Sequence, residues 1–195
     1  MIKCEYVLLV IIMLIIIHVL MIILDRFYEP SKTANISKKP FSKSEYKDAN
    51  EIIDNLWVGN VRSALDREFI ENNNIKLIVN LSKDIEFIDI GGITKVRVPI
   101  HDNLSRESDE GMVKHFDNAY NSIDKTLGEG DGVLIHCWAG MQRSASLCAL
   151  YLMKKNRKSF AEVKGQIRNK RSICFTPGVN FSKSIRYLEN EFKKV

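Results

Sequence analysis

Hydrophobic positions change their spacing several times along the chain, and each change predicts a structural element. Short apolar runs predict buried strands over 75–81, 93–100 and 133–135. Between the last two, apolar residues recur three or four positions apart, which predicts a helix over 110–127. Strands that alternate with helices indicate an α/β fold, in which helices flank a central, mostly parallel sheet.

Weaker patterns predict the remaining elements. Two short strand-like segments, 51–54 and 56–59, precede a helix predicted over 63–72. A further apolar run predicts a helix over 145–153. Two more helices are expected after it, from a capping box at Ser159-Phe-Ala-Glu162 and from apolar residues at positions 181, 185, 188 and 192.

The longest apolar run lies near the N-terminus, where Val7 to Leu24 include no charged residue. As a helix, this run would measure about 27 Å, close to the ~30 Å hydrocarbon core of a bilayer. A signal peptide is the alternative, but its apolar region usually has ~7 to 15 residues and ends at a small-residue cleavage site. No such site follows Leu24, so the pattern predicts a membrane anchor over residues 1–28.

Basic residues predict the orientation of this anchor. Lys3 precedes it, whereas Arg26 and four lysines follow it before residue 44. The positive-inside rule therefore predicts a single-pass membrane protein whose C-terminal part faces the cytoplasm. That compartment is also the reducing one that thiol chemistry needs. We interpret residues 29–47, which are rich in lysine, serine and proline, as a basic flexible linker and residues 48–195 as one catalytic domain.

Overall composition excludes several other classes of function. The net charge of +5 is only mildly basic, so no nucleic-acid partner is expected. The four cysteines show no pairing pattern and the four histidines belong to no metal-binding motif. We therefore expect neither a disulfide framework nor a metal or other cofactor. No pattern indicates an oligomeric state.

The candidate chemistry follows the predicted strand over 133–135. The segment reads His-Cys-Trp-Ala-Gly-Met-Gln-Arg-Ser over residues 136–144, between a strand and a helix. Loop amides and a helix N-terminus form an anion site, to which Arg143 can add a bidentate contact with phosphate. The same positive field stabilises a thiolate. Only Cys137 among the cysteines has an arginine six positions later, which favours a nucleophile over a small core residue.

This segment resembles the signature His-Cys-x-x-Gly-x-x-Arg-Ser of the cysteine-dependent protein phosphatases. It is most similar to the dual-specificity phosphatases, which often have Ala-Gly at the positions of Ala139 and Gly140. The resemblance spans about residues 50 to 190. Two places depart from the family pattern: Met141-Gln142 is an unusual pair, and Pro177-Gly178 stands where the family usually has Pro-Asn.

The resemblance implies hydrolysis of a phosphate ester through a phosphocysteine, without a cofactor. Cys137 would attack phosphorus, and Asp102 would protonate the leaving oxygen and later activate water. Ser144 would donate a hydrogen bond to the departing thiolate, and His136 would orient the loop. The phosphate oxygens would be held by the Arg143 guanidinium and by the loop amides of Trp138, Ala139, Gly140, Met141, Gln142 and Arg143.

Some of these assignments have alternatives. Asp102 is preferred as the acid because it follows a predicted strand in a polar loop, 35 positions before Cys137. Asp109 is its competitor, whereas Asp124 lies inside a predicted helix. Ser144 could instead be only a helix cap, and His136 only a core histidine.

The loop sequence also bears on the substrate. Lipid phosphatases of this superfamily tend to carry Lys or Arg inside the loop, whereas the five residues between Cys137 and Arg143 are uncharged. This difference favours phosphoproteins, and the resemblance implies a shallow site for phosphotyrosine and phosphoserine or phosphothreonine. The alternatives are a phosphatase for phosphoinositides or other non-protein phosphates, and a phosphoprotein-binding module with little turnover.

Overall fold

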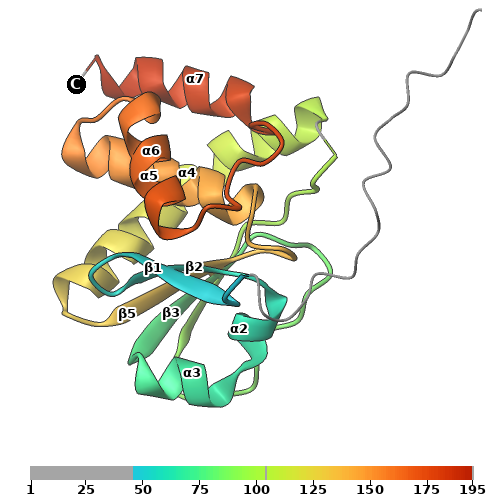
Figure 1. The fold of residues 1–195 in the computed structure, drawn as a ribbon, viewed down its shortest axis with the longest axis vertical. Coiled ribbons are helices and arrows are strands. Elements are labelled where there is room, and N and C mark those ends of the chain that lie inside the picture. Colours follow the sequence, from blue (N-terminus) through green and yellow to red (C-terminus); the bar gives the residue numbers. More distant parts are fainter. Residues whose placement is uncertain (1–45, 104, 195) are drawn as a thin grey trace, which may run out of the picture. The chain divides into compact units, whose positions relative to one another are not determined.

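The computed structural model describes residues 46–103 and 105–194 (Figure 1). In chain order its elements are β1 (Ala49–Ile53), β2 (Leu56–Gly59), α2 (Val61–Leu65), α3 (Arg67–Asn72), β3 (Ile75–Asn80), β4 (Thr94–Arg97), α4 (Arg106–Gly128), β5 (Gly132–His136), α5 (Arg143–Asn156), α6 (Phe160–Lys170) and α7 (Ser182–Phe192). Among these described residues, no helix is both long and apolar enough to cross a membrane. The predicted anchor over 1–28 and the first part of the predicted linker lie outside the described residues.

The sheet has the strand order β1-β2-β5-β3-β4. β1 pairs antiparallel with β2, whereas the pairs β2–β5, β5–β3 and β3–β4 are parallel, so the predicted mostly parallel α/β sheet is confirmed. Gly59, His136 and Asn80 are in register at the ends of β2, β5 and β3. The carboxyl ends of parallel strands are the usual place for a binding site in such sheets. The loop that follows β5 therefore leaves from the middle of this edge.

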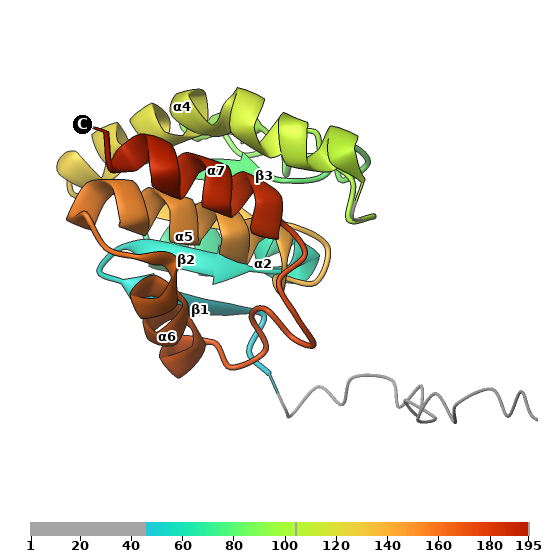
Figure 2. The same cartoon turned by 90° about the horizontal axis from the view of Figure 1, so that it is seen from above.

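Helices cover both faces of the sheet: α4, α5, α6 and α7 lie on one face, and α2 and α3 lie on the other (Figures 1 and 2). The side chains of β5 alternate between the two faces, as expected for a strand. Val133 and Ile135 join the larger core under α4–α7, and Leu134 joins the smaller core under α2 and α3.

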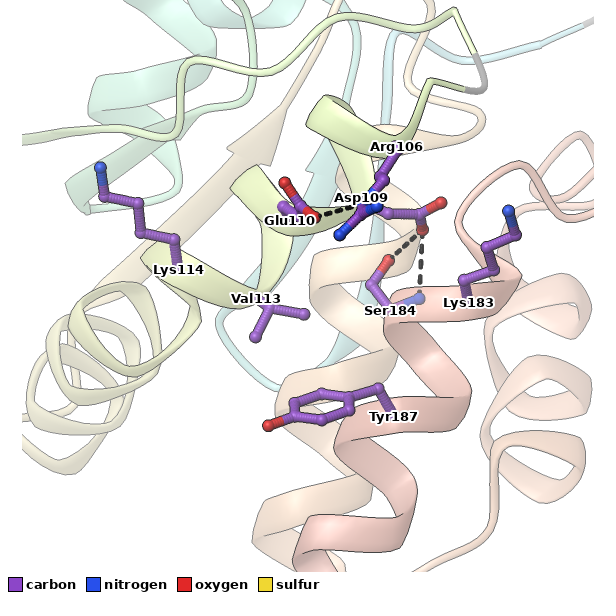
Figure 3. Close-up of a pocket in the computed structure, with 8 residues that line it drawn as sticks. All are labelled: Arg106, Asp109, Glu110, Val113, Lys114, Lys183, Ser184 and Tyr187. Carbon is purple, nitrogen blue, oxygen red and sulfur yellow. Dashed lines mark hydrogen bonds and ion pairs between the residues drawn. The ribbon is translucent and has the colours of Figure 1, made fainter.

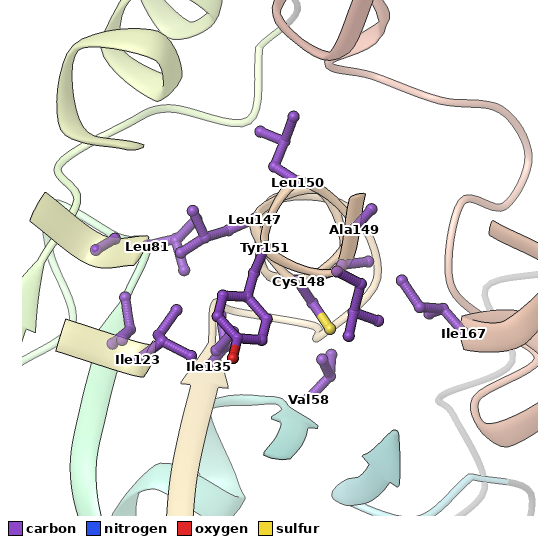
Figure 4. Close-up of a cluster of buried hydrophobic side chains, with 14 of the residues drawn as sticks. Val58, Leu81, Ile123, Ile135, Leu147, Cys148, Ala149, Leu150, Tyr151 and Ile167 are labelled. Carbon is purple, nitrogen blue, oxygen red and sulfur yellow. The ribbon is translucent and has the colours of Figure 1, made fainter. Parts of the chain in front are cut away.

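Helix α5 is the centre of the larger core. Every residue from Arg143 to Met153 is buried, and most of them are apolar, as expected for a helix enclosed by other elements. Its Leu147 and Tyr151 pack among side chains from several other elements, including Ile135 of β5 and Ile123 of α4 (Figure 4). The N-terminus of α5, where the signature segment ends, is therefore held in place by the packing of the larger core.

Three predicted elements differ from the observed ones in their extent. The helix predicted over 63–72 is two helices, because Asp66 adopts an extended backbone and its carboxylate accepts a hydrogen bond from the Phe69 amide at the start of α3. The helix predicted over 110–127 begins earlier, at Arg106, because Ser105 caps it. The strand predicted over 93–100 is only four residues long in β4.

Candidate active site

Cys137 lies at the start of the loop between β5 and α5, and its sulfur has two polar neighbours. The Gly140 amide donates to Cys137 Sγ over 3.3 Å, and Ser144 Oγ lies 3.3 Å from the same sulfur. Gly140 has a φ of +68°, and a Cβ there would lie 2.6 Å from the carbonyl oxygen of Gly59. Only glycine fits this position, which explains the glycine of the signature segment.

The carbonyl groups of residues 138–141 in this loop are bonded to groups outside it. The oxygen of Trp138 accepts from the Val61 amide over 3.2 Å, and that of Met141 accepts from the Phe175 amide over 2.9 Å. The oxygens of Ala139 and Gly140 accept from Arg171. The C=O and N–H groups of a trans peptide point in opposite directions. The N–H groups that follow these carbonyls therefore turn toward the inside of the loop, where Cys137 lies.

Arg171 makes the most extensive of these contacts and was missed by the sequence analysis. Its Nε donates to Gly140 O over 2.9 Å, and Nη1 donates to Lys47 O and Asn50 Oδ1 over 2.8 and 2.7 Å. Burial lowers the pKa of this guanidinium. Its position at the end of α6, among other basic residues, carries no signal that separates it from a solvated arginine.

The guanidinium of Arg143 lies between the loop and the ends of neighbouring strands. Its Nη1 donates to the carbonyl oxygens of Leu81 and Ile100, over 3.1 and 3.4 Å. Its Nε lies 3.5 Å from Oδ2 of Asp102. Three of the residues predicted for the site, Cys137, Arg143 and Asp102, are therefore connected through one loop and one ion pair.

The three candidate carboxylates have different surroundings. Asp102 contacts Arg143, and its Oδ1 accepts from Asn180 Nδ2 over 2.9 Å. Asp109 instead accepts from the amide and the hydroxyl of Ser184, over 3.1 and 2.6 Å, and so caps the first turn of α7 (Figure 3). Asp124 accepts from the Tyr151 hydroxyl and from Lys155. Of the three, only Asp102 contacts a residue of the signature segment within the described part of the chain.

Gln142 connects the two places where the sequence departs from the family pattern. Its Nε2 donates to Thr176 O and Gly178 O over 3.0 and 2.8 Å, and its Oε1 accepts from the Asn180 amide over 3.3 Å. A single side chain therefore holds the backbone of residues 176–180 against the loop. This segment includes Pro177-Gly178, where the family usually has Pro-Asn.

His136 is buried beneath the loop and is neutral at pH 7. Burial lowers its pKa to about 4; the positive charges of Arg97 and Arg143 add to this effect, and the backbone of Cys137 opposes it. The carbonyl oxygen of His136 accepts from the Leu81 amide over 2.9 Å, which joins the ends of β5 and β3.

The remaining candidate features lie away from this loop. A pocket of 390 Å³ between α4 and α7 is lined by Asp109, the competing candidate for the acid, but by no residue of the signature segment (Figure 3). Within residues 46–103 and 105–194, no group of three or more His, Cys, Asp or Glu side chains could hold a metal ion.

The known proteins that this chain resembles belong to one family. The model of the dual specificity phosphatase catalytic domain matches residues 56–191. Dual specificity protein phosphatase 1B of Arabidopsis thaliana is 26% identical over 75% of this chain and 85% of its own length. Human dual specificity protein phosphatase 6 is 29% identical over 81% of this chain, but the match takes in only 40% of that protein.

The fold also resembles that of solved structures. The crystal structure of human DUSP28 superimposes with a TM-score of 0.69 and 21% identity, covering 75% of this chain and 96% of that structure. The signature segment lies inside the matched region. The chain therefore belongs to the dual specificity phosphatases, a family of cysteine-dependent protein phosphatases.

Proposed function

We propose that this chain hydrolyses phosphotyrosine and phosphoserine or phosphothreonine in proteins through a phosphocysteine intermediate. In the first step the Cys137 thiolate attacks phosphorus, so that an S–P bond forms and the P–O bond to the leaving group breaks. Asp102 gives its proton to the leaving oxygen. In the second step water attacks phosphorus, its proton passes to the Asp102 carboxylate, and the S–P bond breaks to release phosphate and the thiolate.

The observation that carries this proposal is the arrangement of the 137–143 loop. Because the carbonyls of residues 138–141 are bonded outward, the amides that follow them converge on one side, where the Gly140 amide already donates to Cys137 Sγ. The Arg143 guanidinium lies beside them and can hold two phosphate oxygens. Preorganised donors of this kind stabilise the charge that spreads over the oxygens during phosphoryl transfer.

The proposed preference for phosphoproteins has two supports. The residues between Cys137 and Arg143 carry no charge, so the loop offers no second cation to a multiply phosphorylated lipid headgroup or other small phosphate. Trp138, directly after Cys137, is 65% exposed and can contact the protein that carries the phosphate. Comparing hydrolysis of a phosphopeptide and a phosphoinositide dispersion by the same preparation would distinguish the two substrate classes.

Replacement of the nucleophile tests the mechanism itself. Cys137→Ser should abolish hydrolysis of p-nitrophenyl phosphate and leave phosphopeptide binding intact, because the loop amides and Arg143 remain. Cys148→Ser is the matched control, because Cys148 is a buried thiol of α5 outside the loop. Turnover by Cys137→Ser would refute the mechanism. If the wild-type protein binds phosphopeptide but does not hydrolyse it, a phosphoprotein-binding module would be favoured.

We further propose that residues 1–28 anchor the chain in a membrane, that 29–47 form a basic flexible linker, and that 48–195 form the catalytic domain in the cytoplasm. The support is the uncharged run from Val7 to Leu24 and the excess of basic residues after it. Such an anchor would raise the effective concentration of the enzyme near membrane-bound substrates without contributing to the chemistry.

A further inference from the structure

Asp102 is held by two residues that contact different oxygens of its carboxylate. Arg143 Nε lies 3.5 Å from Oδ2, and Asn180 Nδ2 donates to Oδ1 over 2.9 Å. The Asp102 side chain is about one-third exposed, and its neighbours His101 and Asn103 are exposed as well. Few other contacts therefore restrict the direction in which this carboxylate points.

Only one of these two contacts is available throughout catalysis. When a phosphate ester binds, the Arg143 guanidinium is needed by the phosphate oxygens. Its ion pair with Asp102 then weakens, while the contact with Asn180 is not affected by the phosphate. Asn180 is thus the residue that can keep Asp102 in place while the leaving group departs.

Asn180 is itself fixed by the phosphate loop. Its backbone amide donates to Gln142 Oε1 over 3.3 Å, and Gln142 Nε2 holds the carbonyls of Thr176 and Gly178 in the same segment. Phe181, the next residue, is buried in the larger core. The position of Asn180 is therefore set by the same loop that contains the nucleophile.

We propose that Asn180, fixed by Gln142, is a positioning residue that holds Asp102 for proton transfer in both steps of the reaction. This inference rests on the proposed function of Asp102. An amide N–H can donate to Oδ1 whether the carboxyl group is ionised or protonated. Because Asn180 occupies Oδ1, the proton is carried on Oδ2, the oxygen on the side of Arg143 and the bound phosphate.

The test is a kinetic comparison across leaving groups. Asn180→Leu keeps the size of the side chain and removes the donor. We expect kcat/KM, which reports the step that breaks the P–O bond, to fall about 10- to 100-fold for phenyl phosphate, a poor leaving group; this is the scale of a small misplacement of a reacting group. An activated aryl phosphate needs little proton transfer and should change less than about threefold. Lys183→Leu, an exposed change just inside α7, is the matched control.

A second background separates positioning from a general structural effect. In Asp102→Ala, the further change Asn180→Leu should alter kcat/KM for phenyl phosphate less than about twofold, because the group that it positions is gone. Gln142→Leu should reproduce the leaving-group dependence, and its effect should not add to that of Asn180→Leu.

The outcomes also separate this inference from the proposed function. An equal loss of kcat/KM for all leaving groups, or an equal loss in the Asp102→Ala background, would overturn the inference. The same holds if Asn180→Leu has no effect while Asp102→Ala retains its leaving-group dependence. Turnover that persists in Cys137→Ser would instead overturn the proposed function.

Discussion

The sulfur of Cys137 and the hydroxyl of Ser144 lie 3.3 Å apart at the two ends of one loop, and Ser144 is fully buried. A hydroxyl in this position can donate to the thiolate that leaves phosphorus in the second step. We expect Ser144→Ala to slow hydrolysis of the phosphocysteine by roughly 10²-fold, the usual effect of removing one preorganised donor. Rapid-mixing measurements should then show a burst of released phenol followed by a slow steady state. A loss without a burst would contradict this role.

Asp102, in a loop, and Asp109, in the first turn of α4, should have separable effects. Asp102→Ala is expected to slow hydrolysis of poor leaving groups by about 10²- to 10⁴-fold. Asp109→Ala removes the acceptor for the Ser184 amide and should lower the free energy of unfolding by about 1–2 kcal/mol, the size of a helix-cap effect. Urea denaturation and leaving-group series on both variants check this separation. Leaving-group dependence in Asp109→Ala alone would identify Asp109 as the acid.

His136 should make the domain less stable in acid. Its pKa is lowered from 6.5 to about 4 in the folded state, so between these values the unfolded chain binds the proton and the folded chain does not. The free energy of unfolding should therefore fall as pH drops from 6.5 to 4, by about 3 kcal/mol in total from this group. Urea denaturation of His136→Asn should show a correspondingly shallower dependence on pH. Parallel curves for the two proteins would contradict the prediction.

Arg171 should contribute to oxyanion binding although it lies outside the loop. Arg171→Met removes the donors to the carbonyls of Ala139 and Gly140, so the amides that follow them lose their fixed direction. We expect the affinity for vanadate to fall about tenfold, and Arg171→Lys to recover part of it. Arg168→Met, an exposed arginine of α6, is the control. Unchanged vanadate affinity in a folded Arg171→Met protein would exclude this contribution.

Membrane attachment can be tested on the full chain. It should sediment with membranes and resist carbonate extraction, whereas removal of residues 1–28 should release an enzyme with unchanged activity on small aryl phosphates. Asn35 begins an Asn-x-Ser sequon just after the predicted anchor. Glycan addition at Asn35 would place the domain on the opposite side of the membrane from our proposal.

The signature residues could be predicted from the sequence because their relationship is local. Cys137, Gly140 and Arg143 fall within seven positions, between a strand and a helix whose patterns are clear. The contacts of Arg171 and Asn180 could not be predicted in this way. Arg171 meets Asn50 across 121 positions, and Asn180 meets Asp102 across 78, so these pairs depend on how distant segments pack.

The same distinction applies to the fold. Periodicity predicted the alternation of strands and helices, since burial of one face imposes it. The division between α2 and α3 depends on the extended backbone of one residue, Asp66, which hydrophobic periodicity does not reveal.

The outward bonding of the 137–143 loop also bears on the order of events during translation. The loop is synthesised before Arg171, Phe175 and residues 176–180, which hold its carbonyls and the Gln142 side chain. A nascent chain that has just emerged through α5 therefore has Cys137 and Arg143 but lacks Arg171 and the segment 176–180, which hold the loop in place. Phosphatase activity should begin only once the segment that precedes α7 has been synthesised and has docked on the loop, so a chain that stops after α5 should be inactive.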